Sequence, residues 1–364
     1  MIGQLGTGGT EKQTVLLARG LRDRGIDTTV WVLFDGGRNE DALRQAGIPV
    51  VRVELRRSRA ALSVLRNAAG FAGLVLRLRR ERPDIVHAFL FSAYVIAVPA
   101  ARLAGIPVLV AGRRSLGNFK EGHKIARAIE RLATSATDLL IANAAAVADD
   151  TKRRERVSAG KIEVIYNGLP EQAFADVAPA VVETAHPVVL CVANLLPYKG
   201  HRYLLEAVSL LQQRGRPCTL LLAGEGRERQ ALARQAVSLA IDARFLGECD
   251  DVRPLLARAD VVAHPSLEEG MSNAVMEAMA AGRAIVATSV GGTPELLSGR
   301  GLLVPPADPA ALADAIGQVL ADGGLAGRLA AAARNWSHAH LKADAMVDRH
   351  VEVYSRLLER RCAA

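Results

Sequence analysis

Two glutamates, Glu269 and Glu277, stand eight residues apart beside a glycine loop and a short apolar run. Gly270 has no Cβ, so a ligand can approach the backbone closely there. Ser272 and Asn273 are good N-cap residues, and the apolar run that follows them predicts a helix. The unpaired N–H groups at a helix N-terminus attract an anion. This segment therefore combines N–H donors for a diphosphate with two carboxylate acceptors for hydroxyl groups.

Ordinary structural roles for the two glutamates are the alternative. Glu269 would then be a surface charge in a loop, and Glu277 would be a buried group held by backbone N–H groups. Glu277 lies about one turn into a run of Ala, Val and Met, where an unpartnered carboxylate is costly to bury. The spacing favours the binding interpretation, because two carboxylates beside an anion site suit a sugar nucleotide.

The segment resembles the Glu-x7-Glu signature of the retaining glycosyltransferases of family 4, which have the two-domain GT-B fold. The matching residues are PSLEEG, EAMAAG and VATSVGGTPEL, between positions 265 and 296. The resemblance covers nearly the whole chain and is densest from 188 to 305. It implies that Glu277 holds the ribose diol and that Glu269 holds the sugar hydroxyls. The implied diphosphate ligands are N–H groups of Gly270, Met271, Ser272 and Asn273.

A turn with the sequence PYKGH follows a predicted strand and precedes a predicted helix. Lys199 in this turn either places a point charge beside a phosphate or is a solvated turn lysine. The turn resembles the Arg…Lys pair with which the family holds the pyrophosphate. Asn194 stands where many members have Arg, so one phosphate cation of that pair is missing here.

Two further loops resemble those that frame the nucleotide. Gly224 permits close approach of a ligand, and the segment from Gly247 through Asp251 to Val252 would receive the base through backbone groups. Ordinary strand-to-helix turns are the alternative for both. The chain has no Asp-x-Asp pair, so we expect no metal and no cofactor besides the nucleoside-diphosphate-sugar. Lys199 and the helix dipole would then balance the leaving diphosphate.

The first half of the chain supplies candidates for the acceptor side. Gly8 and Gly9 belong to GTGGTEK, which resembles the GG-x-E loop that lies over the donor phosphates and faces the acceptor. His87 ends a predicted strand, where ligand-facing residues sit in open α/β sheets. The family often has two histidines here, and Phe89 takes the second position. His87 would touch the sugar or the incoming hydroxyl, although a structural histidine is the alternative.

Arg113 and Arg114 end the next predicted strand. They would face an acceptor, an anionic one included, or would form a surface pair.

Strands and helices alternate along the chain, which predicts parallel sheets with helices on both faces. With the resemblance, this predicts an α/β GT-B architecture of two Rossmann-like doubly wound domains facing across a cleft. The predicted parts are an acceptor-side domain over 1–168, a proline-rich linker over 169–187, a nucleotide-sugar-binding domain over 188–338, and a helix over 339–364 that crosses back. The first strand, within residues 1–5, is short. We expect the natural start to lie upstream and the edge of the first sheet to be incomplete.

The composition is that of an ordinary globular protein and argues against a membrane-spanning segment. The 364 residues are 50% hydrophobic and 23% charged, with no run of 18 apolar residues. Four scattered cysteines fit reduced thiols, and the N-terminus lacks signal-peptide character, so we expect a cytoplasmic protein. The net charge of +8 is concentrated in residues 1–180, with 27 Lys and Arg against 18 Asp and Glu. A GC-rich genome or an anionic partner explains this bias.

The expected function is transfer of a sugar from a nucleoside-diphosphate-sugar to a hydroxyl of a glycan or lipid-linked acceptor, in cell-surface polysaccharide or glycolipid assembly. A GT-B-fold sugar-nucleotide epimerase is one alternative, although the Glu-x7-Glu context does not resemble its site. The other is a non-catalytic basic protein that docks on anionic membrane or nucleic acid. An Arg-rich helix predicted over 58–82, with Leu65 and Leu76 on its apolar side, favours it. We expect at most weak attachment to the inner leaflet, and no nucleic-acid partner.

Overall fold

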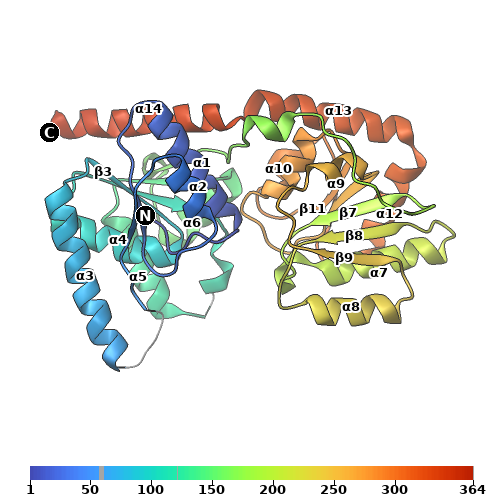
Figure 1. Cartoon of the computed structure of the whole chain (residues 1–364), viewed down its shortest axis with the longest axis horizontal. Coiled ribbons are helices and arrows are strands. Elements are labelled where there is room, and N and C mark those ends of the chain that lie inside the picture. The colour runs from blue at the N-terminus through green and yellow to red at the C-terminus, as the bar shows by residue number, and fades with distance from the viewer. Residues whose placement is uncertain (57–60, 121, 364) are drawn as a thin grey trace. The chain divides into compact units, whose positions relative to one another are not determined.

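The computed structural model describes residues 1–56, 61–120 and 122–363 (Figure 1). The chain divides into two units. The first unit contains residues 1–168 together with 343–364, and the second contains 169–342. Each is an α/β unit with its own parallel sheet, which confirms the predicted pair of doubly wound domains.

All strands of the first unit run parallel. The strands are β1 (Val30–Val32), β2 (Val50–Arg52), β3 (Ile85–Phe89), β4 (Val108–Arg113), β5 (Leu139–Ala142) and β6 (Ile162–Val164). The helices are α1 (Gly9–Asp23), α2 (Asn39–Gln45), α3 (Ala61–Glu81), α4 (Phe91–Ala104), α5 (Lys124–Ser135), α6 (Ala145–Glu155) and α14 (Ala343–Cys362), with short turns η1 (Gly117–Lys120) and η2 (Ala159–Lys161).

The first residues of the chain lie inside this sheet. Ile2 forms parallel bridges to Val32 of β1 and to Phe89 of β3, and so joins the pair β1-β2 to the four strands β3-β4-β5-β6. Its N–H donates to Trp31 at 2.9 Å. The short segment therefore occupies an interior position of the sheet, and the prediction that it forms a sheet edge was wrong.

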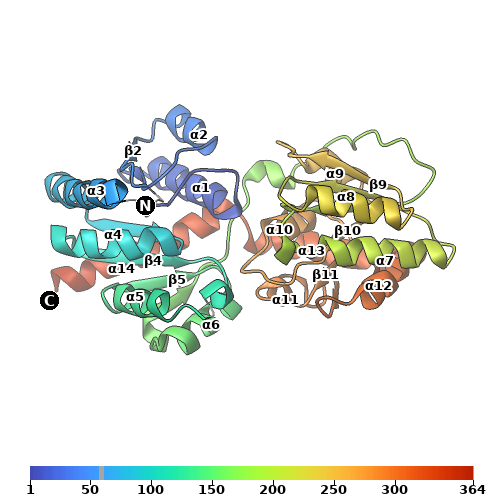
Figure 2. The same cartoon turned by 90° about the horizontal axis from the view of Figure 1, so that it is seen from below.

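Helix α4 lies between α3 and α5 (Figure 2). The predicted helix over 58–82 corresponds to α3, and residues 58–60 lie outside the described part of the chain. The predicted apolar side was wrong, because Leu65 and Leu76 are 70% and 64% exposed. Leu74 and Leu78 are buried instead. In the described ranges, no helix is both long enough and apolar enough to cross a bilayer.

The last helix, α14, is part of the first unit and packs along α1 (Figure 1). Gly20 of α1 leaves room for Val347, since a Cβ at Gly20 would lie 3.1 Å from one Val347 methyl carbon. Val347, Val353 and Tyr354 join the apolar core of the first unit. The single helix predicted over 339–364 was wrong at its start. The preceding helix ends at His340, and α14 begins at residue 343.

The second unit has one six-stranded parallel sheet in the order β12-β11-β10-β7-β8-β9. Its strands are β7 (Val188–Val192), β8 (Thr219–Ala223), β9 (Ala243–Gly247), β10 (Val261–His264), β11 (Ile285–Thr288) and β12 (Leu302–Val304). Its helices are α7 (His201–Gln213), α8 (Arg229–Ser238), α9 (Arg253–Arg258), α10 (Asn273–Ala280), α11 (Thr293–Leu297), α12 (Pro309–Ala321) and α13 (Gly323–His340), with turns η3 (Glu171–Phe174) and η4 (Pro197–Lys199).

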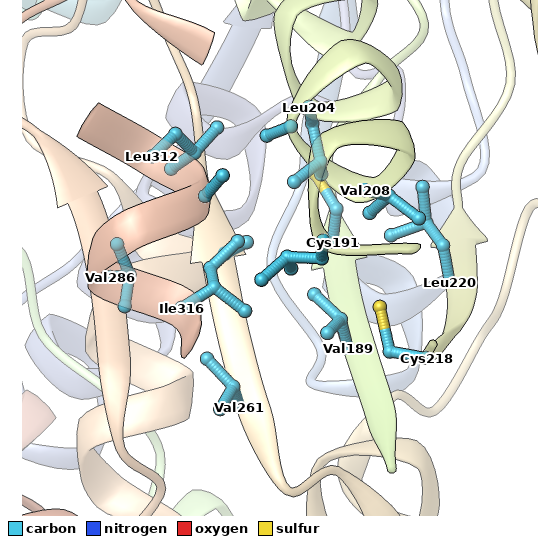
Figure 3. Packing of buried hydrophobic residues seen from close by; sticks show 14 of the residues in the cluster. Val189, Cys191, Leu204, Val208, Cys218, Leu220, Val261, Val286, Leu312 and Ile316 are labelled. Carbon is cyan, nitrogen blue, oxygen red and sulfur yellow. The ribbon is translucent and has the colours of Figure 1, made fainter. Parts of the chain in front are cut away.

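Alternate residues of the central strands carry the main core of the second unit. Val189 and Cys191 of β7 point toward Leu204 of α7 and Ile316 of α12 (Figure 3). The side chains between them, such as Leu190, point to the opposite face, as the pleat of a strand requires. Both faces are fully buried, which explains why the strands read as continuous apolar runs.

The segment 169–187, predicted as a linker, belongs to the second unit. Ala180 N–H donates to Pro254 O at 2.8 Å, and the hydroxyls of Thr184 and Thr219 lie 2.6 Å apart. The proline-containing segment packs on the second unit. The lack of a helix or strand period in its sequence did not predict this packing.

Candidate functional site

The strand order of the second unit defines where a ligand is expected. Counted along the chain, the order is 3-2-1-4-5-6, so the connections leaving the neighbouring strands β7 and β10 run in opposite directions. In open parallel sheets, ligands bind outside the carboxyl ends of the strands at such a switch point. The loops after β7 and β10 carry Lys199 and Glu269, which the sequence indicated as site residues.

These two loops are joined by backbone contacts. Leu267 N–H donates to Tyr198 O at 2.8 Å. Gly200 has a positive φ of 70°, and a Cβ there would overlap the carbonyl oxygen of Pro265. Only glycine permits this approach, so the Lys-Gly pair both supplies the cation and lets the loops meet.

Glu269 lies buried between three donors. Its Oε1 is 2.5 Å from Lys199 Nζ, 2.8 Å from His264 Nε2 and 2.8 Å from the hydroxyl of Ser266. A carboxylate only accepts, so His264 donates from Nε2 and the side chain of Ser266 donates from Oγ. Within the described residues these contacts all fall on Oε1, which leaves Oε2 available to another donor.

The surroundings of Glu269 keep it ionised. Burial alone would raise its pKa, but the hydrogen bond from His264 and the charge of Lys199 outweigh burial and lower the pKa to about 2. The site therefore presents a fixed negative oxygen at neutral pH. The surface-charge alternative for Glu269 is wrong, because the residue is only 8% exposed.

A third strand end supports the same loop. Gly291 follows β11 with φ of 52°, and a Cβ there would overlap the carbonyl oxygen of Glu269. Gly292 N–H donates to Gly270 O at 2.8 Å. The VGGTPE segment noted in the sequence thus holds the backbone that carries the first glutamate.

Helix α10 begins where the sequence predicted. Ser272 is its N-cap, and the hydroxyl accepts from Val275 N–H at 3.3 Å. Met271 is buried before the cap, and Asn273 begins the helix. Glu277 lies one turn further, half-buried between fully buried neighbours. The helix N-terminus and both glutamates therefore belong to one strand-loop-helix segment.

Two predicted nucleotide-loop glycines have a structural explanation. Gly224 has φ of 147°, and a Cβ there would overlap the carbonyl oxygen of Ala193. Its N–H donates to Gly247 O at 2.7 Å. The space predicted for a ligand at Gly224 is thus filled by the chain's own backbone beside Asn194, whose side chain is exposed.

Asp251 and Val252 form the entrance to α9. Both oxygens of Asp251 accept from Arg253, and Oδ1 also accepts from Arg253 N–H at 3.0 Å. The hydrogen bonds from Arg253 lower the pKa of Asp251. Val252 is the N-cap residue. The side chain of Asp251 has a local role here, and the predicted contact of this backbone with a base stays a prediction.

Three residues of this site were missed by sequence reasoning. His264 and Ser266 hold Glu269, and their only signal was their position at the carboxyl end of a buried strand. His201 follows Gly200 and is 2% exposed, with neither ring nitrogen partnered among the described residues. Burial, followed by the nearby His264 and Lys199, lowers the pKa of His201 to about 4.

In the first unit, His87 is held against α14. Its Nδ1 shares a hydrogen bond of 2.7 Å with the Tyr354 hydroxyl, and its ring stacks on Phe89 at 4.0 Å. Burial, then the proximity of His350, lowers the pKa of His87 well below its usual value. His87 Nε2 has no partner in the described part of the chain. One nitrogen therefore has the structural role that was the alternative, and the predicted contact with substrate stays a prediction for the other.

The two arginines after His87 are both buried, so their interpretation as a surface pair was wrong. Arg113 forms two hydrogen bonds with Glu155, at 3.1 and 2.9 Å. Arg114 donates from Nη1 to Asn167 and lies over the Phe89 ring. The side chains of Arg113 and Arg114 thus point to opposite faces of the sheet at the end of β4.

The GTGGTEK loop opens α1. Gly8 is the N-cap, Gly9 is the first helical residue, and Glu11 folds back so that a Cβ at Gly8 would lie 3.1 Å from its carboxyl carbon. An acidic first turn complements the helix dipole. The glycines thus accommodate the chain's own carboxylate, and their predicted position beside the acceptor is untested. Over the described residues, no group of three His, Cys, Asp or Glu could hold a metal ion.

Comparison with known proteins identifies matches over both units. A family model described as Glycosyltransferase Family 4 matches residues 7–172, and one described as Glycosyl transferases group 1 matches residues 186–322. The lipopolysaccharide core biosynthesis glycosyltransferase LpsE of Rhizobium meliloti is 29% identical in an alignment of 365 positions, which covers 95% of each chain. The 2-deoxystreptamine glucosyltransferase of Streptomyces kanamyceticus is 28% identical, over 76% of this chain and 83% of its own.

Solved structures share the fold. Anabaena HepE in complex with UDP-glucose superposes with a TM-score of 0.82 at 24% identity, covering 98% of each chain.

Proposed function

Because this chain belongs to the glycosyltransferases of family 4, we propose that it is a retaining glycosyltransferase. It transfers a sugar from a nucleoside-diphosphate-sugar to a hydroxyl of a glycan or lipid-linked acceptor. The observation that carries the proposal is the placement of Lys199, Glu269 and the start of α10 at the switch point of one parallel sheet. A diphosphate needs cations and N–H donors, and a sugar needs fixed acceptors beside them.

Glu269 is assigned to the hydroxyls of the donor sugar. Three donors on Oε1 orient the carboxylate, and Oε2 accepts from the sugar. Lys199 is placed between that carboxylate and the diphosphate, so one cation contacts both parts of the donor. The N–H groups at the start of α10 share the diphosphate charge.

The proposed chemistry is front-face displacement. The bond between the anomeric carbon and the diphosphate oxygen breaks, and the acceptor hydroxyl forms the new bond on the same face. The acceptor proton passes to the departing diphosphate, so no side-chain nucleophile is required. Lys199 and the helix dipole stabilise the charge that develops on the leaving group, in place of a metal ion.

Product analysis tests the stereochemistry and the metal requirement. Proton NMR of the first product is expected to show the anomeric configuration of the donor, and an inverted product contradicts retention. Turnover is expected to persist in EDTA. Loss of turnover in EDTA with recovery on adding Mg²⁺ contradicts the proposed role of Lys199.

The donor can be identified by a thermal-shift screen of sugar nucleotides. A ligand at one hundred times its Kd stabilises the fold by about 2.7 kcal/mol. UDP-glucose is tested first, because HepE was solved with it. Asp314→Asn serves as the control, since Asp314 is 69% exposed in a surface pair with Arg214. A screen in which no sugar nucleotide raises the melting temperature contradicts the proposal.

Glu277 is assigned to the ribose diol, on its position one turn into α10. We compare the ribonucleotide with its 2′,3′-dideoxy form in the wild type and in Glu277→Gln. The wild type is expected to bind the dideoxy form about tenfold more weakly, from one charged hydrogen bond. Glu277→Gln is expected to bind both forms alike. A variant that still discriminates between them removes Glu277 from the ribose site.

We also propose a cytoplasmic location with weak attachment to the inner membrane, on the basis of α5. Ile125, Ile129 and Leu132 follow one another at helical spacing and are 78%, 46% and 71% exposed. Lys124 and Arg127 lie beside them, also exposed. An apolar stripe with flanking cations suits an anionic bilayer surface.

Vesicle flotation tests this attachment. Wild-type protein is expected to float with vesicles that contain anionic lipid, and Ile125→Ser/Leu132→Ser is expected to remain at the bottom. Val237→Ser, at another strongly exposed apolar residue, is the control. Flotation that is independent of anionic lipid contradicts the proposal.

A further inference from the structure

A hollow of about 350 Å³ lies at the carboxyl ends of β3 and β4 in the first unit. Its lining includes Leu90, Ser92, Gly112, Arg113, Arg114 and Ser115. A Cβ at Gly112 would lie 2.9 Å from the Phe89 ring and 3.4 Å from His87 Nε2. Gly112, which lines the hollow, therefore leaves room for the Phe89 ring, because a Cβ at this position would come too close to it.

Among the described residues, no carboxylate forms an ion pair with Arg114. Arg114 is 8% exposed, and its one hydrogen-bond partner among the described residues is the neutral amide of Asn167. Its Nε is buried without a partner. Burial lowers the pKa of Arg114 to about 10, with no carboxylate among the causes. Buried charges in proteins are normally paired, so this cation requires an anion from outside the chain.

The nearby carboxylates do not supply that anion. Glu155 is engaged by both Arg113 and Thr134, and Glu130 accepts from the hydroxyl of Tyr94. No acidic residue lines the described hollow. Arg113 is thus paired with a carboxylate, whereas Arg114 has no such partner in the part of the chain that the structure describes.

The N-terminus of α4 adds to the positive character. This 14-residue helix has no acidic residue in its first turn, and its N-cap, Leu90, offers no side-chain acceptor. Leu90 also has φ of 70° and ψ of 154°, a conformation almost confined to glycine. The helix therefore opens toward the hollow with its dipole uncompensated by a carboxylate.

We propose that this hollow binds a phosphate group of the acceptor, so that the substrate which receives the sugar is a phosphorylated sugar or glycan. The inference rests on the proposed transferase function and specifies its acceptor class. Arg114 supplies the charge, the start of α4 supplies N–H donors, and the hydroxyls of Ser92 and Ser115 fit the remaining phosphate oxygens. A neutral glycan would leave Arg114 buried and uncompensated.

The proposal is tested by binding at constant ionic strength. Glucose 6-phosphate and glucose are titrated into the wild type and followed by thermal shift, with and without a saturating nucleoside diphosphate. The wild type is expected to bind glucose 6-phosphate at least about tenfold more tightly than glucose, as one charged hydrogen bond provides. Inorganic phosphate is expected to compete with the sugar phosphate.

Three variants distinguish a ligand site from a structural arginine. Arg114→Gln is expected to lose the preference for glucose 6-phosphate. Arg114→Lys is expected to keep part of it, because the charge remains while the planar fork is lost. Arg153→Gln, at a position with a 76% exposed side chain, is expected to behave as the wild type.

Two results overturn the inference. One is equal affinity of the wild type for glucose and glucose 6-phosphate, and the other is an unchanged preference in Arg114→Gln. Binding of the nucleoside diphosphate alone reports on the proposed function, and the sugar-phosphate titration reports on the hollow whether or not the diphosphate binds. Failure of one is therefore separable from failure of the other.

Discussion

Both units bury polar and charged side chains at or near the carboxyl ends of their strands, but the two sets of side chains differ in their hydrogen-bond partners. In the second unit, Glu269 has Lys199, His264 and Ser266 around one oxygen. In the first unit, buried nitrogens of His87, His350 and Arg114 have no partner within the described ranges. Both clusters lie at or near the carboxyl ends of parallel strands. The difference indicates that the second unit orients the Glu269 carboxylate before a ligand arrives, whereas His87 and Arg114 of the first unit rely on a ligand or water for their unpartnered nitrogens.

Catalysis should be reduced most when the Glu269 carboxylate of the second unit is replaced by a neutral amide. Glu269→Gln removes the charge that orients Lys199 and weakens the acceptor offered to the sugar. We expect kcat/KM to fall on the order of a hundredfold or more, as for loss of one oriented polar group in an active site. Release of nucleoside diphosphate measures it, with Asp314→Asn as control. Turnover at the wild-type rate contradicts the assignment.

The loops of the second unit depend on a close glycine contact between the segment after β11 and the backbone that carries Glu269. Gly291→Ala places a Cβ against Glu269 O in a left-handed conformation. We expect a loss of about 3 kcal/mol in unfolding free energy, from overlap and backbone strain together. Gly299→Ala is the matched control, with φ of 72° and no neighbouring atom within 4 Å, and should lose only about 1 kcal/mol. Equal losses would show that the contact is unimportant.

Removing the charge of Lys199 should leave Glu269 without a lysine partner, as Arg114 in the first unit is without a carboxylate partner among the described residues. Lys199→Met leaves Glu269 buried with His264 and Ser266 as its remaining donors, which we expect to cost about 2–3 kcal/mol at pH 7. The pKa of Glu269 is about 2, below its ordinary value of 4.5, so its stabilising contribution is complete above pH 4.5 and is lost as pH falls toward 2. In Lys199→Met that loss should begin at higher pH.

Urea unfolding followed by Trp336 fluorescence, in a Trp31→Phe background, reports on the second unit. The double variant Lys199→Met/Glu269→Gln should recover part of the stability. If it is less stable than Lys199→Met, the ion pair is not the cause.

Over a single pH unit below 6.5, the smallest effect is expected from the histidines of the first unit. Burial lowers the pKa of His350 to about 3 and that of His87 well below 6.5. Below pH 6.5 these histidines bind protons in the unfolded chain but not in the folded unit. The free energy of unfolding therefore decreases as the pH is lowered. Each histidine should contribute about 1.4 kcal/mol per pH unit, until the pH reaches its folded pKa.

Trp31 fluorescence in a Trp336→Phe background follows this unit. His350→Gln should flatten the pH dependence, and His340→Gln, at an exposed position, should leave it unchanged. A pH dependence that is the same in both variants removes His350 from the explanation.

The parts of the site that are local in sequence could be predicted. The cap at Ser272, the helix after it and the glutamate spacing all lie within about ten residues, and the sequence contains the physical signals for them. The pairing of Lys199 with Glu269 joins loops 70 residues apart. Family resemblance indicated both residues, but neither spacing nor composition predicts their contact.

Long-range burial was the main source of error. His87 meets Tyr354 across 267 residues, so nothing near His87 indicates that α14 covers it. A surface pair stayed open as the alternative for Arg113 and Arg114, because the sequence does not reveal the carboxylate and the amide that accept from them. The sequence also did not reveal that the backbone at Ala193, from the segment after another strand, lies against Gly224, and the ligand contact predicted there stays a prediction.

The division of the first unit between two chain segments determines the order in which the molecule can be completed during synthesis. Ile2, Val32 and Phe89 share one core with Met346, Val353 and Leu357, and the 174 residues of the second unit are translated between those two groups. The ribosome therefore releases all of the second unit before α14 exists. The apolar surface of residues 1–168 that α14 covers therefore stays exposed until α14 has been synthesised. The second unit can fold before the first is complete, which reverses the usual order of folding from the N-terminus.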